Sequence, residues 1–222
     1  MAVRKIGINC RSMTGRHGFS GEQFESALER DLLDLLAFDL NVDHCETQPV
    51  TLYYEGSDGQ RHPYTPDVLA FYRRDVLPAR DMPHLLVEVK YRDEYRGRFH
   101  ELKQRFRAAR RYARERGWQF RVLTEREIRT PYLENARFLR PYRDADSDPG
   151  REDRILAYLE TCPKSTPRRA VDALGEDDLE RARLLAVLWR LVADFRVGAD
   201  LLQPIGMQIQ IWSQVQPSDR VA

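Results

Sequence analysis

The spacing of apolar residues predicts an amphipathic helix near the start of the chain. Between positions 20 and 38, apolar side chains recur every three or four residues, which places them on one face of a helix. Ser20 followed by Gln23 is a capping-box pattern, so we predict that this helix begins after Ser20 and ends near Phe38. Its apolar stripe consists of Phe24, Leu28, Leu32, Leu35 and Leu36.

Three strands are predicted to follow this helix as antiparallel neighbours. Residues 46–54 are rich in β-branched and aromatic side chains, and the Asp58-Gly59 pair after them supplies the positive φ angles of a hairpin turn. The return strand carries Asp67 and continues through an apolar run at residues 68–72. A looser loop then leads to the third strand, at residues 85–89.

A strand–helix–strand unit completes this first region. The helix is predicted over residues 98–116, and Gly117 ends it as a C-terminal cap. Residues 118–123 form a fourth strand, which the helical crossover makes parallel to the strand at 85–89. The order αβββαβ around a mixed α/β sheet resembles the restriction-endonuclease-like core. Two short helices are expected next, at residues 125–128 and 131–142.

The last third of the chain is predicted to form a smaller α+β module. Residues 144–150 are acidic and contain Pro149 and Gly150, which is typical of a linker. Three helices and a pair of strands after it suggest a winged-helix-like arrangement. The helices are expected at residues 151–159, 166–174 and 177–195, and the strands at 197–202 and 207–212. The predicted division is an N-terminal arm (1–19), a main α/β domain (20–143), the linker (144–150), the C-terminal module (151–215) and a tail (216–222).

Composition restricts the class of protein without identifying it. With 222 residues, 42% of them hydrophobic, the chain can bury a sizeable core. It has no run of about eighteen apolar residues and no apolar signal segment at its start, so we expect neither a membrane span nor secretion. The three cysteines are scattered without zinc-binding spacing, and no two histidines are four residues apart. A reduced, cytoplasmic setting fits these features.

The candidate chemistry lies on the second and third strands. Glu88 interrupts an apolar run, where a carboxylate is unfavourable unless it has a partner or a function. Residues two apart in a strand project from one face, so Glu88 and Lys90 lie together, and Asp67 can reach them if the two strands pair. Such a group can bind a divalent metal and neutralise the charge of a phosphate. Glu29, too far along the first helix to complement its dipole, is either a surface acid or a third carboxylate of this site, and periodicity does not decide between these.

Positive charge is concentrated in one stretch, although the net charge of the chain is only +1. Residues 92–116 contain ten Lys or Arg residues against four Asp or Glu residues. An Arg-rich helix can be an ordinary solvated surface, but a stripe that begins two residues after Lys90 favours contact with a phosphate backbone. The residues predicted to contact DNA are Arg92, Arg96, Arg98, Lys103, Arg107, Arg110 and Arg111.

The combination of Pro66-Asp67 with Glu88-Val89-Lys90 resembles the pattern of the PD-(D/E)xK nucleases. Three stretches together are similar to one family, TnsA, the endonuclease subunit of heteromeric cut-and-paste transposons. They are residues 25–33 with 46–49, the two site segments, and residues 123–139. The last of them is the most telling, because it contains no candidate catalytic residue. The similarity covers roughly residues 19–142, and the C-terminal module matches more weakly.

This resemblance implies a site and a cofactor. It matches Glu29 to the helix acid of the family, Asp67 and Glu88 to its metal-binding acids, and Lys90 to its motif lysine. The expected catalytic residues are therefore Glu29, Asp67, Glu88 and Lys90. One or two Mg²⁺ ions, with Mn²⁺ as a substitute, are expected on Glu29, Asp67, Glu88 and the Val89 carbonyl. Gln48 is a weaker candidate for supporting the attacking water.

The resemblance also implies partners. TnsA cuts DNA at the 5′ ends of the element, while a DDE transposase, TnsB, cuts and joins the 3′ ends, and an AAA+ ATPase, TnsC, links the pair to the target. The expected location is the bacterial cytoplasm, on the nucleoid when the protein is active. Two alternatives stay open, a stand-alone restriction or repair endonuclease and a non-catalytic adaptor between DNA and the ATPase. For the C-terminal module, contact with DNA and contact with the ATPase are equally open.

Overall fold

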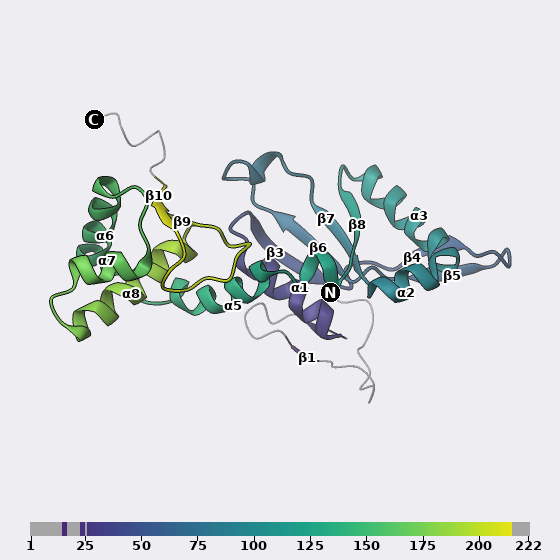
Figure 1. Ribbon diagram of the computed structural model, residues 1–222. Coiled ribbons are helices and arrows are strands. Elements are labelled where there is room, and N and C mark those ends of the chain that lie inside the picture. Colours follow the sequence, from purple (N-terminus) through teal and green to yellow (C-terminus); the bar gives the residue numbers. More distant parts are fainter. Residues whose placement is uncertain (1–14, 17–22, 25, 215–222) are drawn as a thin grey trace. The chain divides into compact units, whose positions relative to one another are not determined.

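The chain folds into two compact units, with the division between Arg129 and Thr130 (Figure 1). Apart from β1 (Gly15–Arg16), the predicted N-terminal arm lies outside the described residues, and so does the predicted C-terminal tail. No helix in the described part of the chain is long and apolar enough to cross a bilayer. The computed structural model describes residues 15–16, 23–24 and 26–214.

A four-stranded mixed sheet forms the centre of the first unit (Figure 1). Its strands are β3 (Val42–Thr47), β6 (Val68–Tyr72), β7 (Leu85–Val89) and β8 (Gln119–Leu123), adjacent in that order. β6 is antiparallel to both β3 and β7, whereas β8 is parallel to β7. A helical crossover joins β7 to β8, and such a connection returns the chain in the same direction. The predicted αβββαβ core and its parallel pair are therefore confirmed.

The predicted single strand at residues 46–54 is wrong, because the chain breaks in its middle. β3 ends at Thr47, and the next residue, Gln48, has a φ of 50°, which is outside the extended region. Pro49 follows and has no N–H group to donate to a neighbouring strand. The second half of the predicted strand therefore leaves the central sheet.

That second half belongs to a hairpin inserted between two strands of the sheet. β4 (Leu52–Glu55) pairs with β5 (Arg61–Tyr64) in a two-stranded sheet of their own. Gly59, with a φ of 71°, lies in the connecting turn, as the Asp-Gly pattern predicts. The antiparallel neighbour of β3 in the central sheet is consequently β6, which follows the hairpin.

The first helix begins later than predicted. α1 (Ala27–Phe38) has Ser26 as its N-cap, and the Ser26 Oγ accepts a hydrogen bond from the Glu29 N–H at 3.1 Å. Residues predicted to form its first turn instead form β2 (Gln23–Phe24), which pairs with β1, and the predicted cap Ser20 lies outside the described residues. The later start places Glu29 in the first turn, contrary to the expectation that it lies too far along the helix.

Apolar clusters cover both faces of the central sheet. α1 and α4 (Glu125–Ile128) pack against one face, and α3 (Phe99–Glu115) packs with the β4–β5 hairpin against the other. Alternate residues of β7 point to opposite faces, so Val87 and Val89 face α1 while Leu86 faces α3. Glu88 shares the direction of Leu86, which brings its carboxylate to the side of α3 and the hairpin.

The predicted long helix between β7 and β8 is confirmed as α3. A shorter helix that the sequence did not predict, α2 (Arg92–Gly97), precedes it. Gly117 follows α3 with a φ of 69°, and the Trp118 N–H donates to the Ala113 carbonyl at 2.8 Å. This left-handed residue and backward hydrogen bond end the helix as predicted.

Within its described residues, 130–214, the second unit consists of four helices and two short strands (Figure 1). They are α5 (Pro131–Arg143), α6 (Pro149–Thr161), α7 (Pro167–Leu174), α8 (Asp178–Ala193), β9 (Val197–Ala199) and β10 (Ile211–Ser213). Thr166 and Asp177, at the predicted starts of two of these helices, cap α7 and α8 with their side chains. The antiparallel pair β9–β10 is present, but both strands are shorter and their connection longer than predicted.

α5 belongs to the second unit, whereas the sequence placed it in the first domain. It packs against α8, and its buried Asn135 holds the segment that connects β9 to β10. The Asn135 Nδ2 donates to the carbonyls of Leu201 and Gln203 at 2.8 and 2.7 Å, and its Oδ1 accepts from the Ile205 N–H at 3.2 Å. The second unit starts at Thr130, well before the predicted linker at residues 144–150, and α6 begins within that linker, at Pro149.

Candidate active site

The pairing of β6 with β7 brings the predicted acids to one place. Val68 lies opposite Val87, so Asp67, one residue earlier, comes opposite Glu88. The Asp67 N–H donates to the Val87 carbonyl at 3.1 Å, and the Asp67 Oδ2 accepts from the Val89 N–H at 2.7 Å. These two bonds hold the Asp67 carboxylate against the end of β7.

Lys90 places its ammonium group among the oxygen atoms of this cluster. Its Nζ lies 3.1 Å from Glu88 Oε1 and 4.0 Å from Asp67 Oδ2, and it donates to the Val89 carbonyl at 2.9 Å. Glu88 is only 2% exposed, so little water screens these charges. The structure therefore brings Asp67, Glu88 and Lys90 together, as the alternation of strand residues predicts.

Burial and mutual repulsion change the proton affinities of the cluster. Burial raises the pKa of Asp67 well above its ordinary value, the charges of Glu88 and Glu29 raise it further, and Lys90 and the Val89 N–H oppose the rise. Burial lowers the pKa of Lys90, but the charges of Asp67 and Glu88 outweigh this and raise it above its ordinary value. The lysine consequently stays positively charged at neutral pH and offsets the negative charge of the two acids.

Two side chains that the sequence did not assign to the site hold Glu88. The Tyr64 hydroxyl donates to Glu88 Oε2 at 2.8 Å, and Arg105 Nη2 lies 3.5 Å from Glu88 Oε1. The Arg105 guanidinium group also lies over the Tyr64 ring, 5.3 Å from its centroid. Burial and the Glu88 charge raise the pKa of Tyr64, so its hydroxyl remains a donor. Tyr64 and Arg105 reach Glu88 because the hairpin and α3 pack against β7, and no pattern in the sequence indicates this contact.

Glu29 and Gln48 lie around Asp67 in different ways. The charge of Glu29 raises the pKa of Asp67, while its Oε1 accepts a hydrogen bond from Ser26 Oγ at 3.0 Å. Gln48 is buried and supports Asp67 through the backbone, because its N–H donates to the Asp67 carbonyl at 2.8 Å. Among the residues that the structure describes, no three His, Cys, Asp or Glu side chains are close enough together to hold a metal ion. The participation of Glu29 in a three-carboxylate site with Asp67 and Glu88 therefore stays a prediction.

The oxygen donors of the cluster nevertheless fit a hard divalent cation. Asp67 and Glu88 offer carboxylate oxygens from neighbouring strands, and the Val89 carbonyl offers a third oxygen beside them. Mg²⁺ is usually bound by one or two carboxylates and keeps its other positions for water and substrate phosphate. A set of two acids and one carbonyl is thus sufficient for such an ion.

The predicted basic stripe is uneven. The residues of the stripe that are both predicted to contact DNA and exposed are Arg96, Arg98, Lys103, Arg107, Arg110 and Arg111. Arg92 is half-buried, and its N–H donates to Glu125 Oε2 at 2.9 Å. Arg98 is paired with Glu101 at 2.9 Å. Contact between this stripe and DNA stays a prediction.

Two family models match the chain in succession. The first, TnsA-like endonuclease N terminal, matches residues 39–125, and the second, TnsA endonuclease C terminal, matches residues 127–201. The first match includes Asp67, Glu88 and Lys90 but does not reach Glu29. None of the curated proteins compared with the chain matches it. The two matched regions follow one another in order, and the sheet with its acidic cluster is consistent with a restriction-endonuclease-like fold. The chain therefore belongs to the TnsA family of endonucleases.

Proposed function

We propose that the chain is the endonuclease subunit of a heteromeric transposase and hydrolyses one DNA strand at each 5′ end of the transposon. The observation that carries this proposal is the meeting of Asp67, Glu88 and Lys90 at the β6–β7 pair in a member of the TnsA family. A buried acid and a half-buried acid beside an ammonium group are unfavourable for folding alone unless they have a function. This combination of charges can bind a metal ion and stabilise the charge that develops in phosphodiester hydrolysis.

Each residue of the cluster has a distinct part in the proposed reaction. The Lys90 ammonium, held by the acids, orients the attacking water or stabilises the negative charge on the scissile phosphate. Tyr64 and Arg105 keep the Glu88 carboxylate oriented. The hydrogen bond from the Val89 N–H orients the Asp67 carboxylate.

A divalent metal, Mg²⁺ with Mn²⁺ as a substitute, would be held by Asp67, Glu88 and the Val89 carbonyl, with Glu29 joining from α1. When bound, such an ion lowers the pKa of a water molecule and neutralises phosphate charge. The participation of Glu29 would require its carboxylate to leave the Ser26 hydroxyl.

The proposed partners divide the task of end recognition. The exposed residues predicted to contact DNA position a strand through its phosphate backbone without reading its sequence. They are Arg96, Arg98, Lys103, Arg107, Arg110 and Arg111. A TnsB-like DDE transposase selects the transposon end and cuts and joins its 3′ strand, and a TnsC-like AAA+ ATPase links both subunits to the target. The second unit of this chain binds either DNA or the ATPase.

The proposal is tested by strand-specific cleavage in a reconstituted system containing the transposase and the ATPase. Asp67→Ala and Glu88→Ala should each abolish cleavage at the 5′ ends and leave 3′ cleavage by the partner intact. Glu115→Ala, which removes an exposed acid of α3, is the matched control and should cut normally. Retained 5′ cleavage in either site variant would remove that residue from the active site. Specific cleavage without the transposase would instead favour a stand-alone endonuclease.

A further inference from the structure

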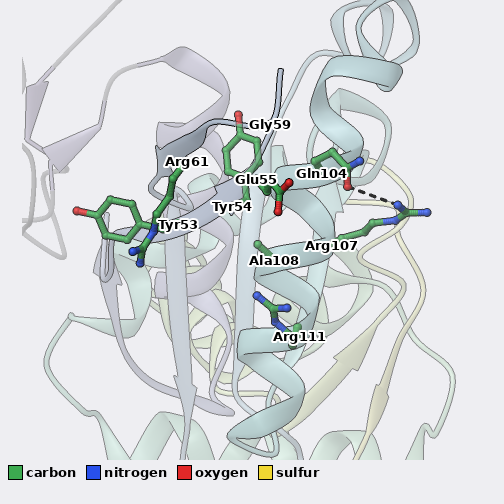
Figure 2. Close-up of a pocket in the computed structure, with 9 residues that line it drawn as sticks. All are labelled: Tyr53, Tyr54, Glu55, Gly59, Arg61, Gln104, Arg107, Ala108 and Arg111. Carbon is green, nitrogen blue, oxygen red and sulfur yellow. Dashed lines mark hydrogen bonds between the residues drawn. The ribbon is translucent and has the colours of Figure 1, made fainter. Parts of the chain in front are cut away.

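A cleft of about 540 Å³ lies between the β4–β5 hairpin and α3 (Figure 2), and Asp67, Glu88 and Lys90 are not among the residues that line it. Tyr53 and Arg61 line it from the hairpin, and Arg107, Ala108 and Arg111 line it from α3. The small side chain of Ala108, between the two arginines, leaves space that a longer side chain would fill. No sequence pattern indicated this cleft, because its two walls are far apart in the chain.

The cleft carries an excess of positive charge. Arg61, Arg107 and Arg111 contribute three guanidinium groups, and Glu55 is the only acid among the lining residues. None of the three arginines forms an ion pair with a carboxylate in the part of the chain that the structure describes. All three are exposed, so their charges are available to an anionic ligand.

The hairpin wall also offers a flat stacking surface. Tyr53 is 52% exposed, and the Arg61 guanidinium group lies over its ring, 4.5 Å from the centroid. Nucleobases stack on aromatic rings and on arginine planes, and sites for unpaired strands combine such surfaces with basic grooves. Phosphate binding alone would need the cations but not the tyrosine. The ligand that uses both features has a base as well as a phosphate.

We propose that this cleft binds an unpaired segment of a DNA strand beside the cleavage site, an inference that rests on the proposed nuclease function. Its volume lies within the range of about 300–1,000 Å³ for small-ligand sites, which suits a short stretch of a single strand. The hairpin also carries Tyr64, and α3 also carries Arg105, and both contact Glu88. A strand held in the cleft is therefore held by the same two elements that orient the active-site acid.

The test measures binding without cleavage, in the presence of a chelator. A fluorescein-labelled single strand of about twelve nucleotides and a blunt duplex of the same sequence are titrated by fluorescence anisotropy. Tyr53→Ala and the double variant Arg107→Ala/Arg111→Ala should each weaken single-strand binding about tenfold. Only the arginine variant should reduce the salt dependence, by about 0.7 in logarithmic slope for each phosphate that is no longer neutralised. Arg114→Ala, an exposed arginine of α3 outside the cleft, is the matched control and should bind normally.

A second variant fills the cleft without changing its charge. Ala108→Leu should weaken single-strand binding as Tyr53→Ala does, with the fold checked by thermal unfolding. Undiminished single-strand binding by Tyr53→Ala would overturn the proposal. An equal loss of single-strand affinity in Arg114→Ala would also overturn it, as would binding of an acidic peptide in place of the strand. If the cleft variants bind normally while 5′ cleavage still requires Asp67 and Glu88, the cleft assignment fails and the nuclease function stands. Cleft-dependent binding without any cleavage would support the cleft assignment and overturn the nuclease function.

Discussion

At the scale of single residues, the Glu88 carboxylate is the most constrained group of the site. One oxygen accepts from Tyr64, and the other lies close to both Lys90 and Arg105. Because Glu88 is buried, these neighbours replace the water that would otherwise solvate its charge. The alternation of strand residues is enough to predict that Glu88 and Lys90 lie together. It says nothing of Tyr64 and Arg105, which reach the site from other elements.

We expect Tyr64→Phe to slow 5′ cleavage about tenfold while DNA affinity stays unchanged. The substitution keeps the buried ring but removes the donor to Glu88, and a tenfold change in rate corresponds to about 1.4 kcal/mol, within the range of a net hydrogen-bond free energy. Single-turnover cleavage and fluorescence anisotropy measure the two quantities separately. Tyr112→Phe, a tyrosine of α3 remote from Glu88, serves as the control. An unchanged cleavage rate would show that Glu88 does not depend on this hydroxyl.

At the scale of elements, the sequence predicts those features whose signals are local. The left-handed Gly117 after α3 and the caps Thr124, Thr166 and Asp177 each follow from the residue at that position. The break at Gln48 could not be predicted in this way, because glutamine has no preference for a positive φ and tertiary packing imposes it. The pairing of β3 with β6 across an inserted hairpin is likewise a non-local choice.

The start of α1 illustrates two competing local signals. Ser20 with Gln23 and Ser26 with Glu29 are both capping-box patterns, and the structure uses the second. We expect Ser26→Ala to lower the free energy of unfolding by about 1 kcal/mol, because it removes the acceptor for the Glu29 N–H. Denaturant unfolding measures this change, with Ser57→Ala in the exposed hairpin turn as the control. Equal stability of the two variants would place the helix start elsewhere.

At the scale of the whole molecule, the acidic cluster lies entirely within the first unit, and the second unit has its own buried charge. Glu152, 6% exposed, accepts a hydrogen bond from Ser147 at 2.8 Å and pairs with Arg190 at 3.3 Å and with Arg196. These partners join α6 to the end of α8 and the start of β9. The sequence predicted the helices but not this network, because no spacing along the chain relates Glu152 to Arg190 or Arg196.

The Glu152 network predicts a pH dependence of stability. Burial raises the pKa of Glu152, but the hydrogen bonds from Ser147 and Arg196 outweigh it, and the pKa falls below its ordinary value of 4.5. A lowered pKa means that the stabilisation is complete above pH 4.5 and is lost as the pH falls through the folded-state value. Glu152→Gln should therefore melt at a lower temperature than the unaltered protein at pH 7, and the difference should shrink in acid. A difference that grows on acidification would contradict this assignment.

Charge balance at the active site has a consequence for how the protein matures. Lys90 and Arg105 supply as many positive charges as Asp67 and Glu88 supply negative ones. The first unit can therefore fold before any metal arrives, unlike small domains whose folding is driven by their ion. Treatment with EDTA should leave the melting temperature unchanged, whereas Lys90→Ala should lower it and make it respond to added Mg²⁺. For the proposed nuclease, this charge balance would allow the chain to be synthesised without metal and to bind it later, on DNA.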